Sequence, residues 1–432
     1  MKIDNLVIKG LFSTFDYNIQ FDNSPNPFII TGLNGYGKTT ILTIINSLSE
    51  KDLYYFYILP FTEICFRFDN KSVLTINSLK EKDIEDNEND SDENLTESKI
   101  VSFEWSFPSG SIGTILLNEQ NISKAVRRLG FYRRTEFDNN NYMSDEFYRF
   151  IKDNSFFYRY FLDSDSSRAL IMMFENFKST FIQAQRTVSV FHETSEMGRH
   201  VNTFTKRSVL DVSEKLGRLL QKEYLKYLNA IQTYDSSFID NLLEATKSLT
   251  DCEYNKLRDQ LENKMNELLQ FGLVRNTAIK PYNADKADIL TVYIESLQKK
   301  LQVYDNILPK LRIFRELVSS SNFVNKTMTF EPSRGIVVKS LDGTFLDVNK
   351  LSSGEQNEII LLYNMIFEVG DNSLLLIDEP EISLHVAWQN HFIDNLETIA
   401  ENKKIQIIVA THSPQIIGDR WESCFDLCEQ SV

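Results

Sequence analysis

A glycine-rich loop close to the start of the chain places the tightest constraint on its fold. Residues 32–39 read GLNGYGKT and match the pattern G-x-x-x-x-G-K-[ST] at every fixed position. An apolar run at residues 27–31 precedes the loop, and a helical pattern at residues 41–48 follows it. In this strand–loop–helix context the backbone amides of the loop close around phosphate groups. The chain is therefore expected to bind a nucleoside triphosphate through Asn34, Gly35, Gly37, Lys38, Thr39 and Thr40.

Two adjacent acidic residues near the other end of the chain predict the partners of this loop. The apolar run at residues 374–377 has the pattern of a buried strand and ends in Asp378 and Glu379. A strand that delivers carboxylates at its carboxyl end can hold a metal ion and polarise a water molecule. A second apolar run, at residues 405–410, leads to His412, so a neighbouring parallel strand would present an imidazole at the same edge. Residues 351–356, LSSGEQ, form a serine–glycine turn that opens a helix and predicts an anion site.

Together these motifs resemble those of the ATP-binding-cassette (ABC) ATPases, in the RecF, SMC and OLD-like branch. The resemblance is carried by the Walker A loop at residues 32–39, the signature at 351–356, the Walker B acids Asp378 and Glu379, a D-loop region at 380–385, and His412 as the switch histidine. The opening residues 3–12 also look like the first strand of that branch. About three hundred residues separate the Walker A loop from the signature, whereas transporter subunits have only a short helical subdomain there. A transporter subunit is therefore disfavoured.

The resemblance implies a division of roles around ATP and Mg²⁺. Lys38 would neutralise phosphate charge, and Thr39 and Asp378 would hold Mg²⁺. Glu379 would be the general base that orients water, and His412 would sense the γ-phosphate. Residues 180–187 resemble a Q-loop, in which Gln185, or alternatively Gln183, would bridge Mg²⁺ and the attacking water, while Arg186 would reach a phosphate.

The signature implies a second subunit. In the proteins that this chain resembles, the signature of one head completes the active site of a partner head, with ATP sandwiched between the two. A head-to-head dimer or a higher homo-oligomer is therefore expected, at least with ATP bound. His385, in the D-loop region, has either a structural role or a dimer contact. The signature residues concerned are Ser352, Ser353, Gly354 and Glu355.

The predicted fold class is α/β: a P-loop ABC-type ATPase head, with a mixed sheet and an antiparallel subdomain, that carries an inserted helical bundle or short coiled-coil arm. The expected segments are 1–200 for the N-terminal part of the head, 205–322 for the arm and 323–432 for the C-terminal part. Leucines at three- and four-residue spacings predict helices between residues 207 and 321, with breaks near 235–237 and 276–283. Strands are expected at residues 17–21, 53–68, 72–79, 99–107, 111–117, 327–330 and 335–338.

Charge and composition restrict the partners. The formal net charge of −15 disfavours a surface that coats DNA uniformly, because phosphate contacts depend on local Lys and Arg. Residues 124–134 interleave basic and aromatic side chains, which suits either nucleic-acid contact or an ordinary surface helix. The acidic residues 81–98 predict a solvated loop or a docking segment for a basic partner. The four cysteines are too scattered for a disulfide framework, and without a membrane span or secretory signal the expected location is the cytoplasm.

Two classes of function remain open. In the first, the chain is the ATPase of an anti-phage defence system of the PARIS or Septu type, a sensor and scaffold for a separate effector nuclease of the Toprim or HNH kind. The sequence stops about twenty residues after His412, which leaves no room for the Toprim domain of OLD-like nucleases. In the second, the chain is a DNA-binding repair or clamp ATPase similar to RecF or SMC proteins. The first is favoured by the short arm, the missing Toprim domain and the acidic surface.

Overall fold

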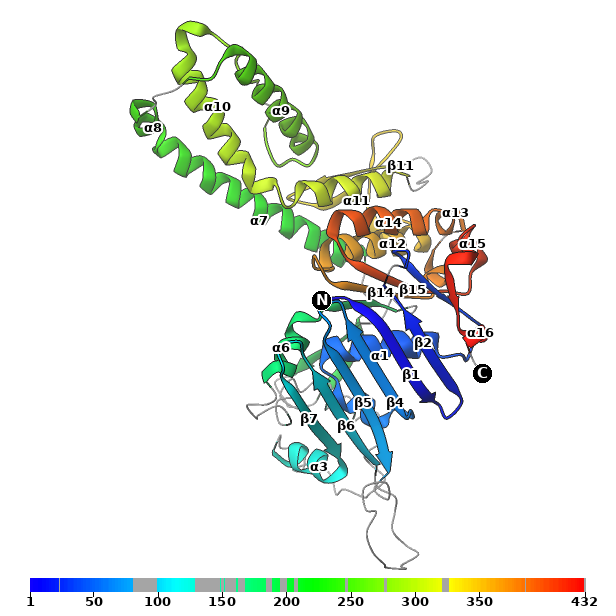
Figure 1. Cartoon of the computed structure of the whole chain (residues 1–432). Helices are drawn as coiled ribbons and strands as arrows, with labels where there is room; N and C mark the ends of the chain where they lie inside the picture. Colours follow the sequence, from blue (N-terminus) through cyan, green and yellow to red (C-terminus); the bar gives the residue numbers. More distant parts are fainter. Residues whose placement is uncertain are drawn as a thin grey trace, which may run out of the picture. The chain divides into compact units, whose positions relative to one another are not determined.

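The computed structural model describes most of the chain (Figure 1). The described residues are 1–22, 24–80, 99–128, 148, 151, 161, 168–183, 189–194, 200–205, 209–244, 248–275, 278–320, 326–384 and 386–430. The chain divides into two compact units. The first consists of Met1–Ala184, Val369–Ile382 and Val386–Val432, and the second of Gln185–Glu368 with Ser383–His385.

An antiparallel sheet of six strands, in the order β2–β1–β4–β5–β6–β7, makes up much of the first unit (Figure 1). The central strands are rich in β-branched and aromatic residues, and most of their apolar side chains are buried. Leu6 of β1 lies opposite both Ile19 of β2 and Phe66 of β4. The strands are β1 (Ile3–Leu11), β2 (Phe15–Gln20), β4 (Glu63–Phe68), β5 (Val73–Lys80), β6 (Lys99–Ser106) and β7 (Ile112–Asn118).

A second sheet in the same unit is parallel throughout and has the order β16–β3–β15–β14–β8. Every residue of β14 is buried, as its continuous apolar sequence predicts. Because the strands are parallel, β3, β14, β15 and β8 all end at one edge, although they come from opposite ends of the chain. The strands are β3 (Phe28–Thr31), β8 (Ser179–Ile182), β14 (Leu374–Asp378), β15 (Gln406–Ala410) and β16 (Cys424–Asp426).

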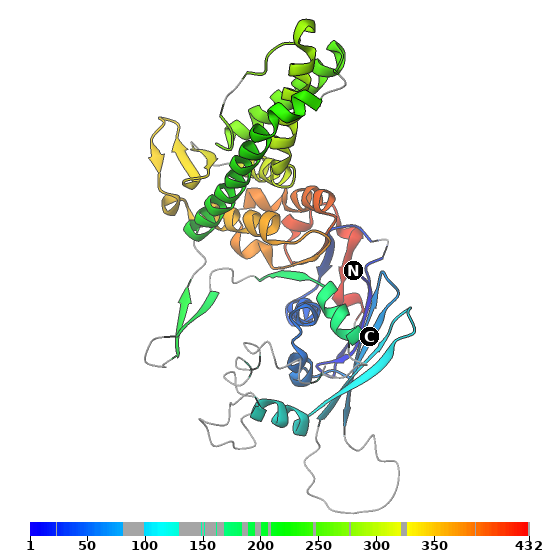
Figure 2. The same ribbon diagram turned by 90° about the vertical axis from the view of Figure 1, so that its left-hand side faces the viewer.

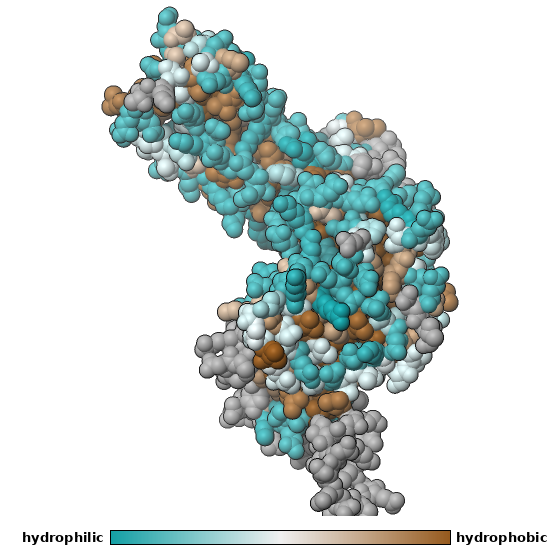
Figure 3. Space-filling view, in the orientation of Figure 1, coloured by the Kyte–Doolittle hydropathy of each residue, from teal (hydrophilic) through white to brown (hydrophobic). Residues whose placement is uncertain are grey.

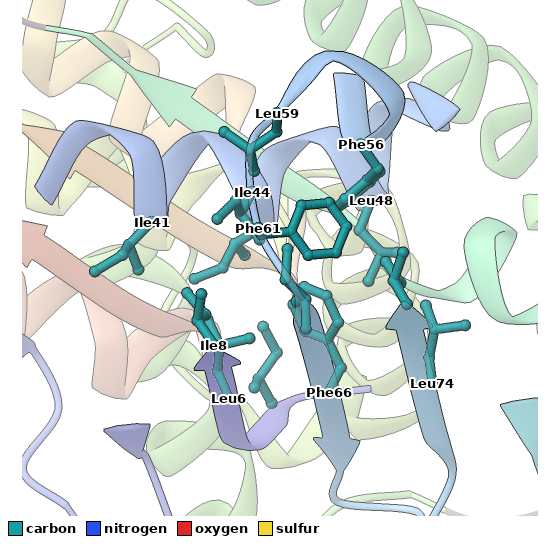
Figure 4. Close-up of a cluster of buried hydrophobic side chains, with 14 of the residues drawn as sticks. Leu6, Ile8, Ile41, Ile44, Leu48, Phe56, Leu59, Phe61, Phe66 and Leu74 are labelled. Atoms are coloured by element: carbon teal, nitrogen blue, oxygen red, sulfur yellow. The ribbon is translucent and has the colours of Figure 1, made fainter. Parts of the chain in front are cut away.

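One hydrophobic core joins the antiparallel sheet to the helix that follows the glycine-rich loop. Side chains of α1 (Lys38–Glu50) point toward those of the sheet (Figure 4). Ile41 and Ile44 of α1 are fully buried, as are Ile8 of β1 and Leu74 of β5. Each such side chain stabilises the fold by about 1.5–3 kcal/mol relative to an exposed one. This packing fixes α1, and with it the loop at its N-terminus.

The prediction of a continuous strand pattern across residues 53–68 is wrong for its first part. Residues Leu53–Ile58 form a helix, α2, and strand β4 begins only at Glu63. Asp52 caps this helix by accepting a hydrogen bond from the backbone N–H of Tyr55 at 3.0 Å. The aromatic run therefore packs against the sheet as a helical turn, with Phe56 edge-on to Phe103 at a ring-centroid distance of 5.8 Å.

The remaining elements of the first unit surround the two sheets. The helices are α3 (Glu119–Arg128), α6 (Arg168–Asn176), α13 (Val386–Gln389), α14 (Phe392–Lys403), α15 (Pro414–Ile417) and α16 (Leu427–Gln430), together with the short turns η9 (Pro380–Ser383) and η10 (Trp421–Ser423).

The second unit is mainly helical, as predicted (Figures 1 and 2). The expected breaks are present: α7 ends at Ser236, and non-helical chain follows Gln270. Thr250 and Glu253 form a capping box that begins α9. The helices are α7 (Val209–Ser236), α8 (Phe238–Glu244), α9 (Asp251–Gln270), η5 (Ala284–Lys286), α10 (Ala287–Leu301), η6 (Gln302–Tyr304), α11 (Leu308–Ser320), η7 (Val348–Lys350), α12 (Ser353–Tyr363) and the π-helical η8 (Asn364–Glu368).

Small sheets complete this second unit. Its strands are β9 (Ser189–Thr194), β10 (His200–Thr205), β11 (Lys326–Glu331), β12 (Gly335–Ser340) and β13 (Phe345–Leu346). Gly335 sits against α7, where an added Cβ would lie 1.8 Å from the carbonyl oxygen of Ser213. The Ser213 hydroxyl accepts from the Ile336 N–H at 2.9 Å and donates to the Arg334 carbonyl at 3.2 Å. These contacts explain why residues 326–368 group with the helices, although the expected boundary assigned them to the C-terminal segment 323–432.

Most of the visible surface is hydrophilic, with apolar side chains in separate patches (Figure 3). Within the described ranges, every helix falls short of the length or the apolar character needed to cross a membrane.

Candidate functional site

The glycine-rich loop connects β3 to α1 and depends on glycine at two positions. Gly35 and Gly37 have φ angles of 93° and 83°, which side chains disfavour, and Gly37 is the N-cap of α1. The Lys38 ammonium is buried and donates to the carbonyl oxygens of Gly32 at 2.7 Å and Leu33 at 3.1 Å. The lysine side chain therefore lies inside the curve of the loop. The loop amides and the N-terminus of α1 form an anion site around it.

The acidic end of β14 lies against the first turn of α1. The Thr39 hydroxyl donates to Oδ2 of Asp378 at 2.8 Å, across 339 residues of sequence. Asp378 is only 4% exposed, and its Oδ1 has no hydrogen-bond partner among the described residues. Burial raises the pKa of Asp378, and the nearby charges of Glu379 and Glu381 add to this, whereas the Thr39 hydroxyl and Lys38 oppose it. A buried, unpaired carboxylate oxygen beside a hydroxyl fits a hard cation such as Mg²⁺, which prefers oxygen ligands.

Glu379 and His412 come together because β14 and β15 are neighbours in register. Asp378 lies opposite Ala410, and the Glu379 N–H donates to the Ala410 carbonyl at 2.9 Å. Glu379 has a φ angle of 41°, a left-handed conformation that is uncommon outside glycine and that is found at functional sites. The Nδ1 atom of His412 lies 3.9 Å from Oε1 of Glu379. The structure thus brings the predicted base and the predicted switch histidine to the same edge as Lys38 and Thr39.

One acidic residue was missed as a site residue. Glu381 accepts hydrogen bonds from the Thr411 hydroxyl at 2.9 Å on both carboxylate oxygens and from the His412 N–H at 3.0 Å. The imidazole Nδ1 of His412 lies 3.2 Å from the same carboxylate. The signal was present, because residues 378–381 read DEPE and place a second acid two residues after Glu379.

The signature turn lies in the second unit and is a well-formed helix start. Ser352 is the N-cap of α12 and forms a capping box with Glu355. Lys326 also donates to both carboxylate oxygens of Glu355, at 2.7 and 2.9 Å. Burial alone would raise the pKa of Glu355, but Lys326 and Ser352 outweigh it and lower the pKa. Glu355, predicted to contact nucleotide, thus already has structural partners, whereas a Cβ on Gly354 would meet no atom within 4 Å.

Other predicted residues fall partly or wholly outside the described ranges. Gln183, the alternative Q-loop residue, follows β8 at the carboxyl edge of the parallel sheet and is exposed. Of the basic segment 124–134, only Lys124–Arg128 belong to the described α3, where Lys124 is exposed. The remaining ones, Gln185, Arg186, His385 and the acidic residues 81–98, lie outside the described residues.

Curated relatives match short parts of the chain. Protein ea59 of Escherichia phage lambda is 32% identical over 75 residues, which are 17% of this chain and 14% of that protein. The "Retron Ec83 probable ATPase" of Escherichia coli is 31% identical over 137 residues, which are 28% of this chain and 24% of that protein. The chain therefore spans less than a quarter of the length of either relative.

Solved structures and a family match extend over the chain. The Smc head domain with an extended coiled coil bound to the C-terminal domain of ScpA, from Pyrococcus furiosus, aligns with a TM-score of 0.35 and 14% identity over 96% of this chain and 91% of that one. The SMC head domain from Thermotoga maritima aligns with a TM-score of 0.29 and 12% identity over 98% and 92%. The AAA ATPase domain family matches residues 1–417. The chain, an α/β protein with an inserted helical section, belongs to this AAA ATPase domain family.

Proposed function

We propose that the chain binds ATP with Mg²⁺ at the carboxyl edge of its parallel sheet and hydrolyses it. The observation that carries this proposal is the contact between Thr39 and Asp378, which leaves the buried Oδ1 of Asp378 without a partner among the described residues. Thr39 and Asp378 would hold Mg²⁺, which when bound supplies positive charge to the β and γ phosphates. Lys38 would release the two loop carbonyls and donate to phosphate oxygens in their place.

In this proposal Glu379 accepts a proton from the attacking water. Its side chain is about a quarter exposed, so that water can reach it. His412 lies beside it and donates to the γ-phosphate. Gln185, or Gln183 directly after the neighbouring strand β8, would orient the same water.

We further propose that two copies dimerise through ATP, with Ser352, Ser353 and Gly354 of one copy completing the site of the other. Among the described residues, an added Cβ on Gly354 would meet no atom within 4 Å outside its own helix and chain neighbours, which supports an approach of phosphate to this turn. A role as the sensor or scaffold of an anti-phage defence system, controlling a separate nuclease, is supported by the likeness to a retron ATPase. The matched region covers 28% of this chain.

The test is the substitution Glu379→Gln in the full chain. The variant should bind ATP with unchanged affinity, retain it unhydrolysed and accumulate as a dimer, as measured by phosphate release and mass photometry. Glu401→Gln, on the exposed face of α14, is the matched control and should behave as wild type. Turnover by Glu379→Gln at the wild-type rate would show that the base is another residue. Wild-type protein without Mg²⁺-dependent turnover would refute the proposed function, and turnover that depends on duplex DNA would favour a clamp ATPase.

A further inference from the structure

The loop that carries His412 is held by a small hydrogen-bonded network centred on Glu381. Glu381 lies in the turn η9, directly after the Walker B acids, and its side chain is only 10% exposed. It accepts from the hydroxyl of Thr411, which is fully buried, and from the backbone N–H of His412. The same Thr411 hydroxyl accepts from the N–H of Ser413 at 3.0 Å. One carboxylate thus holds Thr411 and His412 directly, and Ser413 through the Thr411 hydroxyl.

A second connection ties the two sides of this network together. Gln389 of α13 donates to the backbone carbonyl of Glu381 at 3.2 Å and accepts from the Ser413 hydroxyl at 3.1 Å. Thr411 is held from the other side, because its N–H donates to the Ile30 carbonyl of β3 at 3.1 Å. The His412 loop is therefore attached to the strand that leads into the glycine-rich loop and to the turn that follows Glu379.

The imidazole itself contacts this carboxylate more closely than it contacts the predicted base. Nδ1 of His412 lies 3.2 Å from Oε1 of Glu381 but 3.9 Å from Oε1 of Glu379. A carboxylate beside one ring nitrogen orients the ring and leaves the other nitrogen for a substrate. Here Nδ1 is the ring nitrogen beside the carboxylate, which leaves Nε2 for a γ-phosphate.

We propose that Glu381 is the positioning residue of this ATPase: it holds His412 in the orientation that acts on the γ-phosphate. The proposal rests on the proposed function, because it assumes that His412 and Glu379 serve hydrolysis. Glu381 itself does not touch nucleotide. Its loss should therefore slow turnover without weakening ATP binding.

The experiment is a double-mutant cycle on kcat and KM in the full chain. Glu381→Ala should lower kcat by about tenfold or more while KM changes by less than about twofold, because only transition-state contacts are lost. His412→Ala should give a similar loss. The double variant should be no slower than His412→Ala alone, because both changes remove the action of the same histidine. Glu381→Gln keeps an oxygen acceptor for Thr411 and the His412 N–H, so it should fold as wild type and recover part of kcat.

The controls separate this proposal from simpler explanations. Glu401→Ala removes an exposed carboxylate of the same unit and should leave both constants unchanged. Full kcat in Glu381→Ala, or losses that multiply in the double variant, would overturn the positioning role while leaving the ATPase proposal intact. A matched rise in KM without loss of kcat would also overturn it. Absence of turnover in the wild-type protein would overturn both proposals.

Discussion

A buried carboxylate next to the signature turn makes the stability of the second unit depend on pH. Glu358 of α12 is 6% exposed, and its Oε1 has no hydrogen-bond partner among the described residues. Burial, with a contribution from the charge of Glu355, raises the pKa of Glu358 from 4.5 to about 8. The folded protein therefore disfavours the charged form, whereas the unfolded chain loses its proton near the ordinary pKa. The resulting penalty on stability is absent below pH 4.5, grows as pH rises, and is complete above pH 8.

The substitution Glu358→Gln removes this penalty while keeping the shape of the side chain. Since one pKa unit corresponds to about 1.36 kcal/mol, the full penalty is roughly 5 kcal/mol above pH 8 and about 3 kcal/mol at pH 7. Between pH 5 and pH 8.5, the free energy of unfolding of the variant should gain about 4 kcal/mol relative to wild type.

Urea unfolding of both proteins at these two pH values, followed by helical circular dichroism, measures the difference. Glu401→Gln, at an exposed position, should show no such trend. The diagnostic quantity is the change with pH, because the amide also needs hydrogen bonds and so shifts stability by a constant amount. An offset between Glu358→Gln and wild type that is the same at pH 5 and pH 8.5 would refute the reasoning.

Two further predictions concern the loop and the packing of the second unit. Lys38→Met removes the cation inside the glycine-rich loop, so ATP affinity measured by calorimetry should fall roughly 10- to 100-fold. Lys51→Met, at the C-cap of α1, is the control. Unchanged affinity in Lys38→Met would exclude phosphate contact by Lys38. Gly335→Ala places a Cβ 1.8 Å from the Ser213 carbonyl oxygen, so the urea midpoint should drop by an amount equivalent to about 2–4 kcal/mol. An added Cβ at Gly343 meets no atom of the described residues within 4 Å, so Gly343→Ala should lower the stability less. Equal losses would show that the backbone conformation, and not the contact with Ser213, sets the loss of stability.

The elements that form the candidate site could be predicted because each has a local signature. The loop before Lys38 and the run that ends in Asp378 are short patterns whose strand and helix context is written beside them. The fold class, an α/β ATPase with a helical insertion, is confirmed for the same reason. The residue roles stay predictions.

What could not be predicted depends on contacts between distant residues. The aromatic run after Leu53 has a strand-like composition, and only the cap by Asp52 and the packing of Phe56 against the sheet make it helical. The acid Glu381 is written in the sequence beside Glu379, but its contact with His412 depends on the register of β14 and β15. The grouping of residues 326–368 with the helices likewise follows from the fit of Gly335 to α7, which no local pattern records.

The strand before the glycine-rich loop has consequences for how the protein is made. In the parallel sheet β3 lies between β15 and β16, both from the last part of the sequence. Gly32 also packs toward Leu427, and the Leu33 N–H donates to the Cys428 sulfur. During synthesis, β3 therefore leaves the ribosome before both of its neighbours, and the backbone N–H and C=O groups along its two edges stay unpaired until β15 and β16 follow. Until then the loop at residues 32–39 lacks the contacts with Leu427 and Cys428 that it has in the folded chain.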